Sequence, residues 1–175
     1  ERGAKLMDIG MLQVASSLSA GAFEDIELTH HDREMIKRHP AEGADMLAAI
    51  RPNWEIIPLV RGHHEWWNGM GYPDGLKGEA IPLGARILSI ADSFVAMTSW
   101  RSFRGSMDAK EAAKEISAYG GVQFDPKVVA AFLAMVTPRI YAMNEDNEHE
   151  MELSMLREIN EAGDKPETQK YPHPL

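Results

Sequence analysis

The sequence predicts an all-α protein, and three observations lead to that prediction. Apolar residues recur at helical spacing, most clearly in the segment that holds Ile87, Leu88, Ala91, Phe94 and Val95. Residue pairs typical of helix starts precede these segments. Hardly any segment alternates apolar and polar residues with the period of two that marks a strand. We therefore expect a single bundle of helices over residues 1–140.

Start signals place each helix in turn. Thr29 with Asp32 resembles a capping box. Pro40 and Pro82 suit first helical turns, where the missing N–H costs nothing. Asp108 and Asp125 are residue types that cap helix starts. The expected helices cover about 30–38, 40–50, 53–67, 82–98, 108–120 and 125–135.

The ends of the chain carry separate expectations. Residues 1–10 resemble the middle of a domain, so one or more helices are expected upstream of Glu1. Residues 141–163 are acidic and are expected to form a C-terminal helix, and 164–175 hold three prolines and are expected to be a loose tail. Apolar residues near this end favour a helix packed on its own domain, with a homodimer as the alternative.

Composition excludes several classes of protein. The formal net charge of −9 disfavours DNA as a partner, because phosphate neutralisation needs lysine and arginine. No apolar run of about 18 residues offers a membrane span, and no signal-peptide pattern opens the chain. Cysteine is absent, which excludes disulfides and thiolate ligands and fits a cytoplasmic location.

The most informative stretch runs from His63 to Leu76. Two adjacent histidines stand at an expected helix end, and a loop rich in glycine follows. Neutral imidazoles are the commonest metal ligands in proteins, and a buried pair needs a partner. A loop with this much glycine must turn tightly or approach another group closely. The stretch therefore indicates a metal-centred pocket with a shaped rim.

Five residues could share one metal centre: Asp8, His39, His63, His64 and Asp92. Their oxygen and nitrogen donors suit iron, manganese, zinc or nickel. The histidines and Asp92 also have simpler interpretations. His39 before a proline is more often a surface or capping residue, and Asp92 could bond to a neighbouring helix end. Adjacent helical residues point about 100° apart, so the histidine pair need not converge.

Three further residues are candidates for ligand binding. Arg101 and Arg104, spaced at i,i+3, could clamp a phosphate, although by themselves they fit a solvated basic loop better. Tyr72 could stack on a ring or only pack the glycine loop. The residues by themselves define no reaction.

Taken together, these motifs resemble the HD-GYP family of bacterial cyclic di-GMP phosphodiesterases, within the HD metal-dependent phosphohydrolases. The resemblance runs from about Ala4 to Met135. The matching pieces are His39-Pro40, His63-His64-Glu65, Gly69 to Leu76, Gly78, Ile81-Pro82, Ala85-Arg86-Ile87, Ala91 to Phe94, Ala96 to Ser99, Arg101 and Gly121 to Pro126.

The resemblance implies an HD-superfamily helical bundle with a GYP loop and a divalent metal centre, usually of iron or manganese. In that scheme Asp8 is the catalytic aspartate and bridges two metals. The three histidines complete the ligands of one metal, and Asp92 is a ligand of another. Tyr72, Arg101 and Arg104 would lie at the nucleotide. The implied partners are cyclic di-GMP or a related nucleotide, and a protein bound through the GYP loop.

Two positions depart from the family's His-Asp-Ile-Gly-Lys signature, which here reads Met7 to Met11. Met7 replaces a metal-binding histidine with a thioether that suits hard metals poorly. Met11 replaces the lysine expected to help bind phosphate. Val95 also stands where the family usually has a polar residue.

These departures divide the functional interpretations. The leading one is a degenerate domain that holds about one metal per chain, hydrolyses cyclic di-GMP weakly or not at all, and retains nucleotide or protein binding. The alternative is an active metal-dependent phosphodiesterase. A third is an interaction module without catalysis, which an absence of bound metal would favour.

Overall fold

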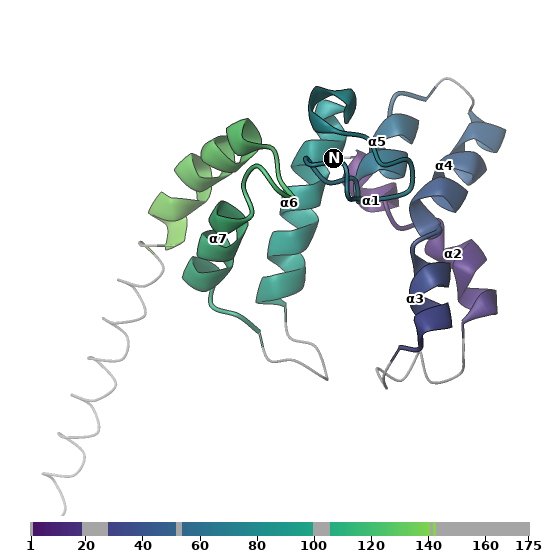
Figure 1. Ribbon diagram of the computed structural model, residues 1–175, viewed down its shortest axis with the longest axis horizontal. Helices are drawn as coiled ribbons and strands as arrows, with labels where there is room; N and C mark the ends of the chain where they lie inside the picture. Colours follow the sequence, from purple (N-terminus) through teal and green to yellow (C-terminus); the bar gives the residue numbers. More distant parts are fainter. Residues whose placement is uncertain (1, 19–27, 52–53, 100–105, 141, 143–175) are drawn as a thin grey trace, which may run out of the picture. The chain divides into compact units, whose positions relative to one another are not determined.

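The computed structural model describes residues 2–18, 28–51, 54–99, 106–140 and 142 (Figure 1). The chain divides into two compact units, Glu1–Thr137 and Pro138–Leu175, and nearly all described residues belong to the first. The expected acidic helix at 141–163 lies outside the described residues except for residue 142, and the tail at 164–175 lies wholly outside them. Both remain predictions, as does the homodimer.

The first unit is helical, which confirms the predicted fold class. Its described residues form no strand, only one isolated bridge between Gly120 and Phe124. Residues 126–137 are helical as well. The elements are α1 (Arg2–Leu6), α2 (Met11–Val14), the 3-10 turn η1 (Ala15–Ser17), α3 (His30–Ile36), α4 (His39–Ile50), α5 (Ile57–Gly62), the 3-10 turn η3 (Gly78–Ala80), α6 (Leu83–Thr98) and α7 (Ala109–Ala118). Of the described helices, none is both long and apolar enough to cross a bilayer.

Several expected helix starts are confirmed in atomic detail. The Thr29 side chain accepts a hydrogen bond from the Asp32 amide, and the Asp32 carboxylate accepts one from the Thr29 amide, which completes a capping box. Pro40 lies in the first turn of α4. At α7, the Asp108 side chain accepts from the Lys110 amide at 2.7 Å. These local interactions satisfy backbone donors that a helix start leaves unpaired.

The expected helix at 53–67 is wrong in length, because α5 covers only Ile57–Gly62. Pro58 lies in its first turn, where a residue without an N–H fits, so the helix begins here. At the other end the Glu65 amide donates to the Gly62 carbonyl at 3.1 Å, which forms a turn. The chain therefore leaves the helix at His63 and continues into the glycine loop.

Two apolar clusters form the core of this unit. Leu47, Ile56 and Val60 pack between α4 and α5. The second cluster lies between α6, α7 and the following helix and consists of Ile90, Ile116, Phe124 and Val129. Helix α5 packs against both α4 and α6, so the histidines at its end are held between two cores.

Candidate metal centre

A backbone contact brings the Asp8 segment to α4. Gly10 is buried, and a Cβ atom there would overlap the His39 carbonyl and lie 2.5 Å from the Gly43 amide. Only glycine allows the backbone to approach this closely. Because Asp8 precedes this contact by two residues, its carboxylate reaches the first turn of α4.

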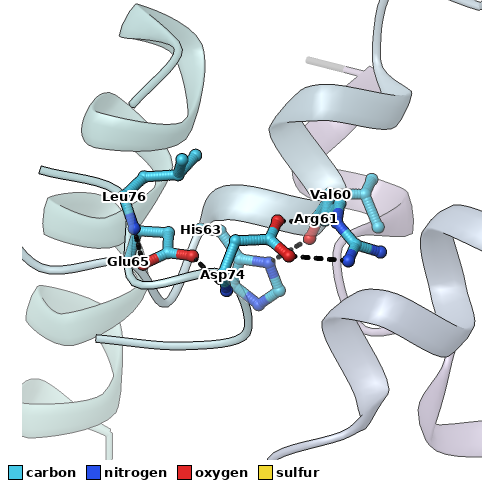
Figure 2. Close-up of polar contacts among 6 residues, drawn as sticks. All are labelled: Val60, Arg61, His63, Glu65, Asp74 and Leu76. Atoms are coloured by element: carbon cyan, nitrogen blue, oxygen red, sulfur yellow. Dashed lines mark hydrogen bonds and ion pairs between the residues drawn. The ribbon is translucent and has the colours of Figure 1, made fainter. Parts of the chain in front are cut away.

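His39 and His63 are fixed in the same way. Each is buried, with 3% and 0% of its surface exposed. His39 Nδ1 lies 2.7 Å from the Ile36 carbonyl. His63 Nδ1 lies 2.7 Å from the Val60 carbonyl, a contact drawn in Figure 2. A carbonyl oxygen only accepts, so each Nδ1 must carry a proton. In a neutral ring, Nε2 is then left with a lone pair.

The four residues Asp8, His39, His63 and His64 converge on one point. Each offers one ligand atom, and all these atoms lie within 4.8 Å of one another. The Nε2 atoms of His39 and His63 are 3.2 Å apart, and His39 Nε2 is also 3.2 Å from Asp8 Oδ1. The surface or capping interpretation of His39 is therefore wrong.

The adjacent histidines both face this cluster, with ring centroids 4.2 Å apart. They converge because α5 ends at Gly62, so the helical rotation between neighbours no longer separates them. The Asp8 side chain, by contrast, is 56% exposed. The cluster thus has histidines on its protein side and a carboxylate on its solvent side.

The donor set fits a divalent metal. With both rings neutral, the lone pairs of His39 Nε2 and His63 Nε2 face each other and the Asp8 carboxylate across about 3 Å, a distance typical of hydrogen bonds. Without a cation or a proton between them, these atoms repel. A metal ion at this point would take the place of the proton through which His39 bonds to Asp8. Mixed imidazole and carboxylate donors are those that iron and manganese accept.

The electrostatics keep these ligands in their metal-binding forms. Burial lowers the pKa of His63, and it lowers the pKa of His64 to about 3, with the neighbouring imidazoles adding to the effect. The hydrogen bond with His39 lowers the pKa of the Asp8 carboxyl, against the opposing effect of burial. Near neutral pH the site therefore presents neutral His63 and His64 rings and an ionised Asp8.

The other predicted residues are placed differently. Tyr72 stacks on His64, with ring centroids 4.9 Å apart. Asp92, half-buried on α6, is not one of the four converging residues. Its charge opposes the lowering of the His63 pKa by burial and adds to the raising of the Tyr72 pKa by burial. Its role as a ligand stays a prediction. Arg101 and Arg104 lie outside the described residues.

Sequence reasoning missed the role of Glu65. Its side chain is buried, and its two oxygens accept from the Asp74 amide at 2.7 Å and the Leu76 amide at 3.0 Å (Figure 2). A signal was present in the sequence. A glycine-rich loop leaves many backbone donors to satisfy, and Glu65 is a carboxylate directly before it.

A second attachment holds the same loop to α5. Arg61 donates from Nε and Nη2 to the two carboxylate oxygens of Asp74, both at 2.7 Å (Figure 2). Such a two-pronged contact fixes orientation as well as distance. The loop is therefore tied to the helix end that carries the histidines.

The described residues thus form a helical domain in which three histidines and an aspartate converge, an arrangement typical of helical proteins that hold a metal ion. Residues 2–128 match the HD domain family. The chain belongs to the HD domain family and, by its histidine pair and GYP loop, to the HD-GYP type.

Among curated proteins, the chain is 36% identical over 135 residues to the cyclic di-GMP phosphodiesterase response regulator RpfG of Xanthomonas campestris pv. campestris, covering 76% of this chain and 35% of that protein. It is 39% identical over 112 residues to a cyclic di-GMP phosphodiesterase of Thermotoga maritima, covering 62% of this chain and 30% of that one. The chain thus spans about a third of the length of these relatives.

A solved structure is also similar. It is the crystal structure of a cyclic GMP-AMP specific phosphodiesterase of V. cholerae, V-cGAP3. The TM-score is 0.52 at 34% sequence identity, covering 65% of this chain and 27% of that one. This similarity supports the helical HD fold.

Proposed function

We propose that this chain is the HD-GYP domain of a cyclic di-GMP signalling protein, with an incomplete metal centre and weak or no hydrolysis. The observation that carries the proposal is the convergence of Asp8, His39, His63 and His64 beside a signature that holds Met7 and Met11. The candidate ligands of one metal lie close together. At two positions of the signature, however, a methionine replaces the histidine or lysine that the family usually has.

Each residue has a role in this proposal. His39, His63 and His64 hold one divalent metal, iron or manganese, from the protein side, and Asp8 holds it from the solvent side. When bound, such a metal supplies Lewis acidity and a water of lowered pKa. Burial raises the pKa of Tyr72 to about 12, with the charges of Asp92 and Asp8 adding to it, so the phenol stays protonated and can donate to a phosphate oxygen.

Three apolar positions argue for impaired turnover. Met7 offers a soft thioether to a hard metal, and Met11 offers no charge to a phosphate. Val95 lies one turn beyond Asp92 and is 58% exposed, and its apolar side chain offers no polar contact to a ligand. A two-metal site clamps both the attacking and the leaving oxygen. Losing one metal should therefore remove several kcal/mol of transition-state stabilisation, roughly three or more orders of magnitude in rate.

The second candidate is an active phosphodiesterase. What favours it is that Asp8, His39, His63 and His64 converge as candidate ligands and that the curated relatives are named as phosphodiesterases. Some relatives are named as 3'3'-cGAMP-specific, so the substrate class to test includes both cyclic dinucleotides.

Protein binding through the GYP loop is a further part of the proposal. Met70 on this loop is 77% exposed, and exposed methionines suit adaptable contacts. Such binding would not depend on the metal, whereas nucleotide binding would.

The deciding experiment separates binding from turnover. Calorimetry with cyclic di-GMP and 3'3'-cGAMP measures affinity in the presence of Mn²⁺, and product analysis measures hydrolysis. We expect measurable affinity and little or no product for the unmodified chain, and more product for the double variant Met7→His with Met11→Lys. Rapid hydrolysis by the unmodified chain, abolished in Asp8→Ala, would replace this proposal with the active-enzyme alternative.

A further inference from the structure

The three imidazoles of the metal centre are oriented in two different ways. His39 and His63 each donate from Nδ1 to the carbonyl three residues earlier, at 2.7 Å. Within the described part of the chain, the His64 ring makes no such bond to the backbone. Its broad face is covered by Tyr72 instead, with planes 25° apart.

We propose that the Tyr72 ring orients His64 as a metal ligand, and that Glu65 acts through Tyr72 by holding the glycine loop over the histidines. This inference rests on the proposed metal binding. Tyr72 and Glu65 are positioning residues here. The ring stack performs for His64 the function that backbone carbonyls perform for the other two histidines.

The path of the loop explains how Tyr72 reaches this position. A Cβ atom on Gly71 would overlap the Trp66 amide and lie 2.5 Å from the His64 carbonyl. The backbone at Gly71 therefore packs directly against the backbone of residues 64–66. The Tyr72 amide then donates to the same carbonyl at 3.1 Å. Tyr72 is therefore tied by its backbone to the residue on which its ring stacks.

Glu65 holds the far side of this turn. Its two oxygens accept the amides of Asp74 and Leu76, two and four residues after Tyr72 (Figure 2). Both oxygens are occupied in this way, and Glu65 is not among the four converging residues. A carboxylate next to two metal-site histidines thus serves the loop and not the metal.

The affinity for the metal should fall when this support of His64 is lost. Groups that orient a ligand from outside the first coordination sphere typically contribute 10- to 100-fold in metal affinity. A leucine at position 72 fills space without a flat ring face, so the His64 ring gains rotational freedom that metal binding must remove. Phenylalanine keeps the face and loses only the hydroxyl.

The first test compares Mn²⁺ affinity, by calorimetry, in Tyr72→Leu, Tyr72→Phe and a matched control. Tyr119→Leu is that control, because Tyr119 is a tyrosine 43% exposed on another element. We expect a loss of roughly 10-fold or more for Tyr72→Leu, as outer support of a ligand predicts. Tyr72→Phe and Tyr119→Leu should bind as the unmodified chain does.

The second test needs no metal. In the metal-free protein, nitrogen-15 NMR of the histidine side chains should show His39 and His63 with the proton on Nδ1 in every variant. The His64 ring protons should lose their ring-current shift in Tyr72→Leu and keep it in Tyr72→Phe. Unchanged His64 signals in Tyr72→Leu would overturn the inference, even for a chain that binds no metal.

The third test asks whether Glu65 works through Tyr72. Glu65→Gln replaces one acceptor oxygen with an amide donor that faces a loop N–H, so it should weaken Mn²⁺ binding. Two residues acting through one contact are not additive. The double variant with Tyr72→Leu should therefore bind about as weakly as Tyr72→Leu alone. Fully additive losses would show that Glu65 acts by another route.

These outcomes separate the inference from the proposed function. If the chain neither binds nor hydrolyses cyclic dinucleotides, the proposed function is contradicted, but the proposed role of Tyr72 is not. An equal Mn²⁺ affinity of the unmodified chain and Tyr72→Leu would remove the role of Tyr72, whatever the chain does to nucleotides.

Discussion

Arg86 on α6 and Asp125, directly before the helix that starts at residue 126, form a buried ion pair, with Nη1 and Oδ2 2.6 Å apart. The Asp125 side chain is 1% exposed, and its other oxygen accepts from the Lys127 amide at 2.8 Å. Arg86 also donates from Nε to the Ile81 carbonyl at 2.9 Å. One guanidinium therefore joins α6 to both a loop and a helix cap.

Replacing Arg86 should destabilise the domain strongly. Arg86→Leu leaves the Asp125 carboxylate buried without its cation, and breaking a buried pair in this way costs about 3 kcal/mol or more. We expect that loss in the free energy of unfolding, measured by urea denaturation at pH 7. Lys37→Leu is the control, since the Lys37–Glu34 pair lies half-exposed on one helix and should leave the urea midpoint nearly unchanged. Equal midpoints for the two variants would contradict the ion pair's importance.

The same pair predicts how stability depends on pH. Burial by itself would raise the pKa of Asp125, but the hydrogen bonds from Arg86 and the Lys127 amide outweigh it and hold the pKa below 3.8. A lowered pKa in the folded state stabilises the protein above the unfolded value and is lost as pH falls through the folded value. Stability should therefore fall below about pH 4, and less steeply in Arg86→Leu. An identical acid slope in both proteins would refute the assignment.

A methyl group at Gly10 should separate Asp8 from the histidines. Its Cβ would overlap the His39 carbonyl, so Gly10→Ala forces the Asp8 segment away from α4. Overpacking of this kind typically costs about 1–3 kcal/mol. We expect lower stability together with weaker Mn²⁺ binding. Gly3→Ala is the matched control, because its Cβ would meet Leu59 at an ordinary 3.4 Å. Unchanged Mn²⁺ affinity in Gly10→Ala would show that this contact does not position Asp8.

The Arg61–Asp74 pair should contribute little to stability. The two side chains are 38% and 35% exposed, and ion pairs at this exposure are worth about 1 kcal/mol or less. Asp74→Asn should therefore lower the urea midpoint slightly at low salt and hardly at all at 1 M salt, where charges are screened within about 3 Å. A large, salt-independent loss would mean that the side chain of Asp74 supports the loop by another contact.

The sequence allowed most of the helical framework to be predicted, because helix starts are local. The Thr29–Asp32 box and the Asp108 cap depend on residues within one turn, and both are confirmed. The end of α5 was mispredicted because it depends on tertiary structure. The contacts of Glu65 with the returning loop are not compatible with a helix beyond Gly62. These contacts depend on residues distant from α5, so local helix propensity does not predict them.

The four residues that converge are among the candidates that the sequence singled out, but their geometry could not be predicted. His39, His63 and His64 were singled out by residue type and by a family resemblance. Asp8, however, reaches them through the close contact of Gly10 with Gly43, 33 residues further along the chain. The adjacent histidines both face the cluster because α5 ends at Gly62. The sequence places Glu65 directly before a loop with many backbone donors, and the structure shows which two amides it binds.

The most direct test of this account is the metal content of the purified chain, measured by elemental analysis without added chelator or metal. The account predicts about one iron or manganese per chain, because Asp8 and the three histidines form one set of ligands while Met7 leaves a second set incomplete. The His63→Ala variant should lose it. Two or more equivalents per chain, or none, would contradict the account.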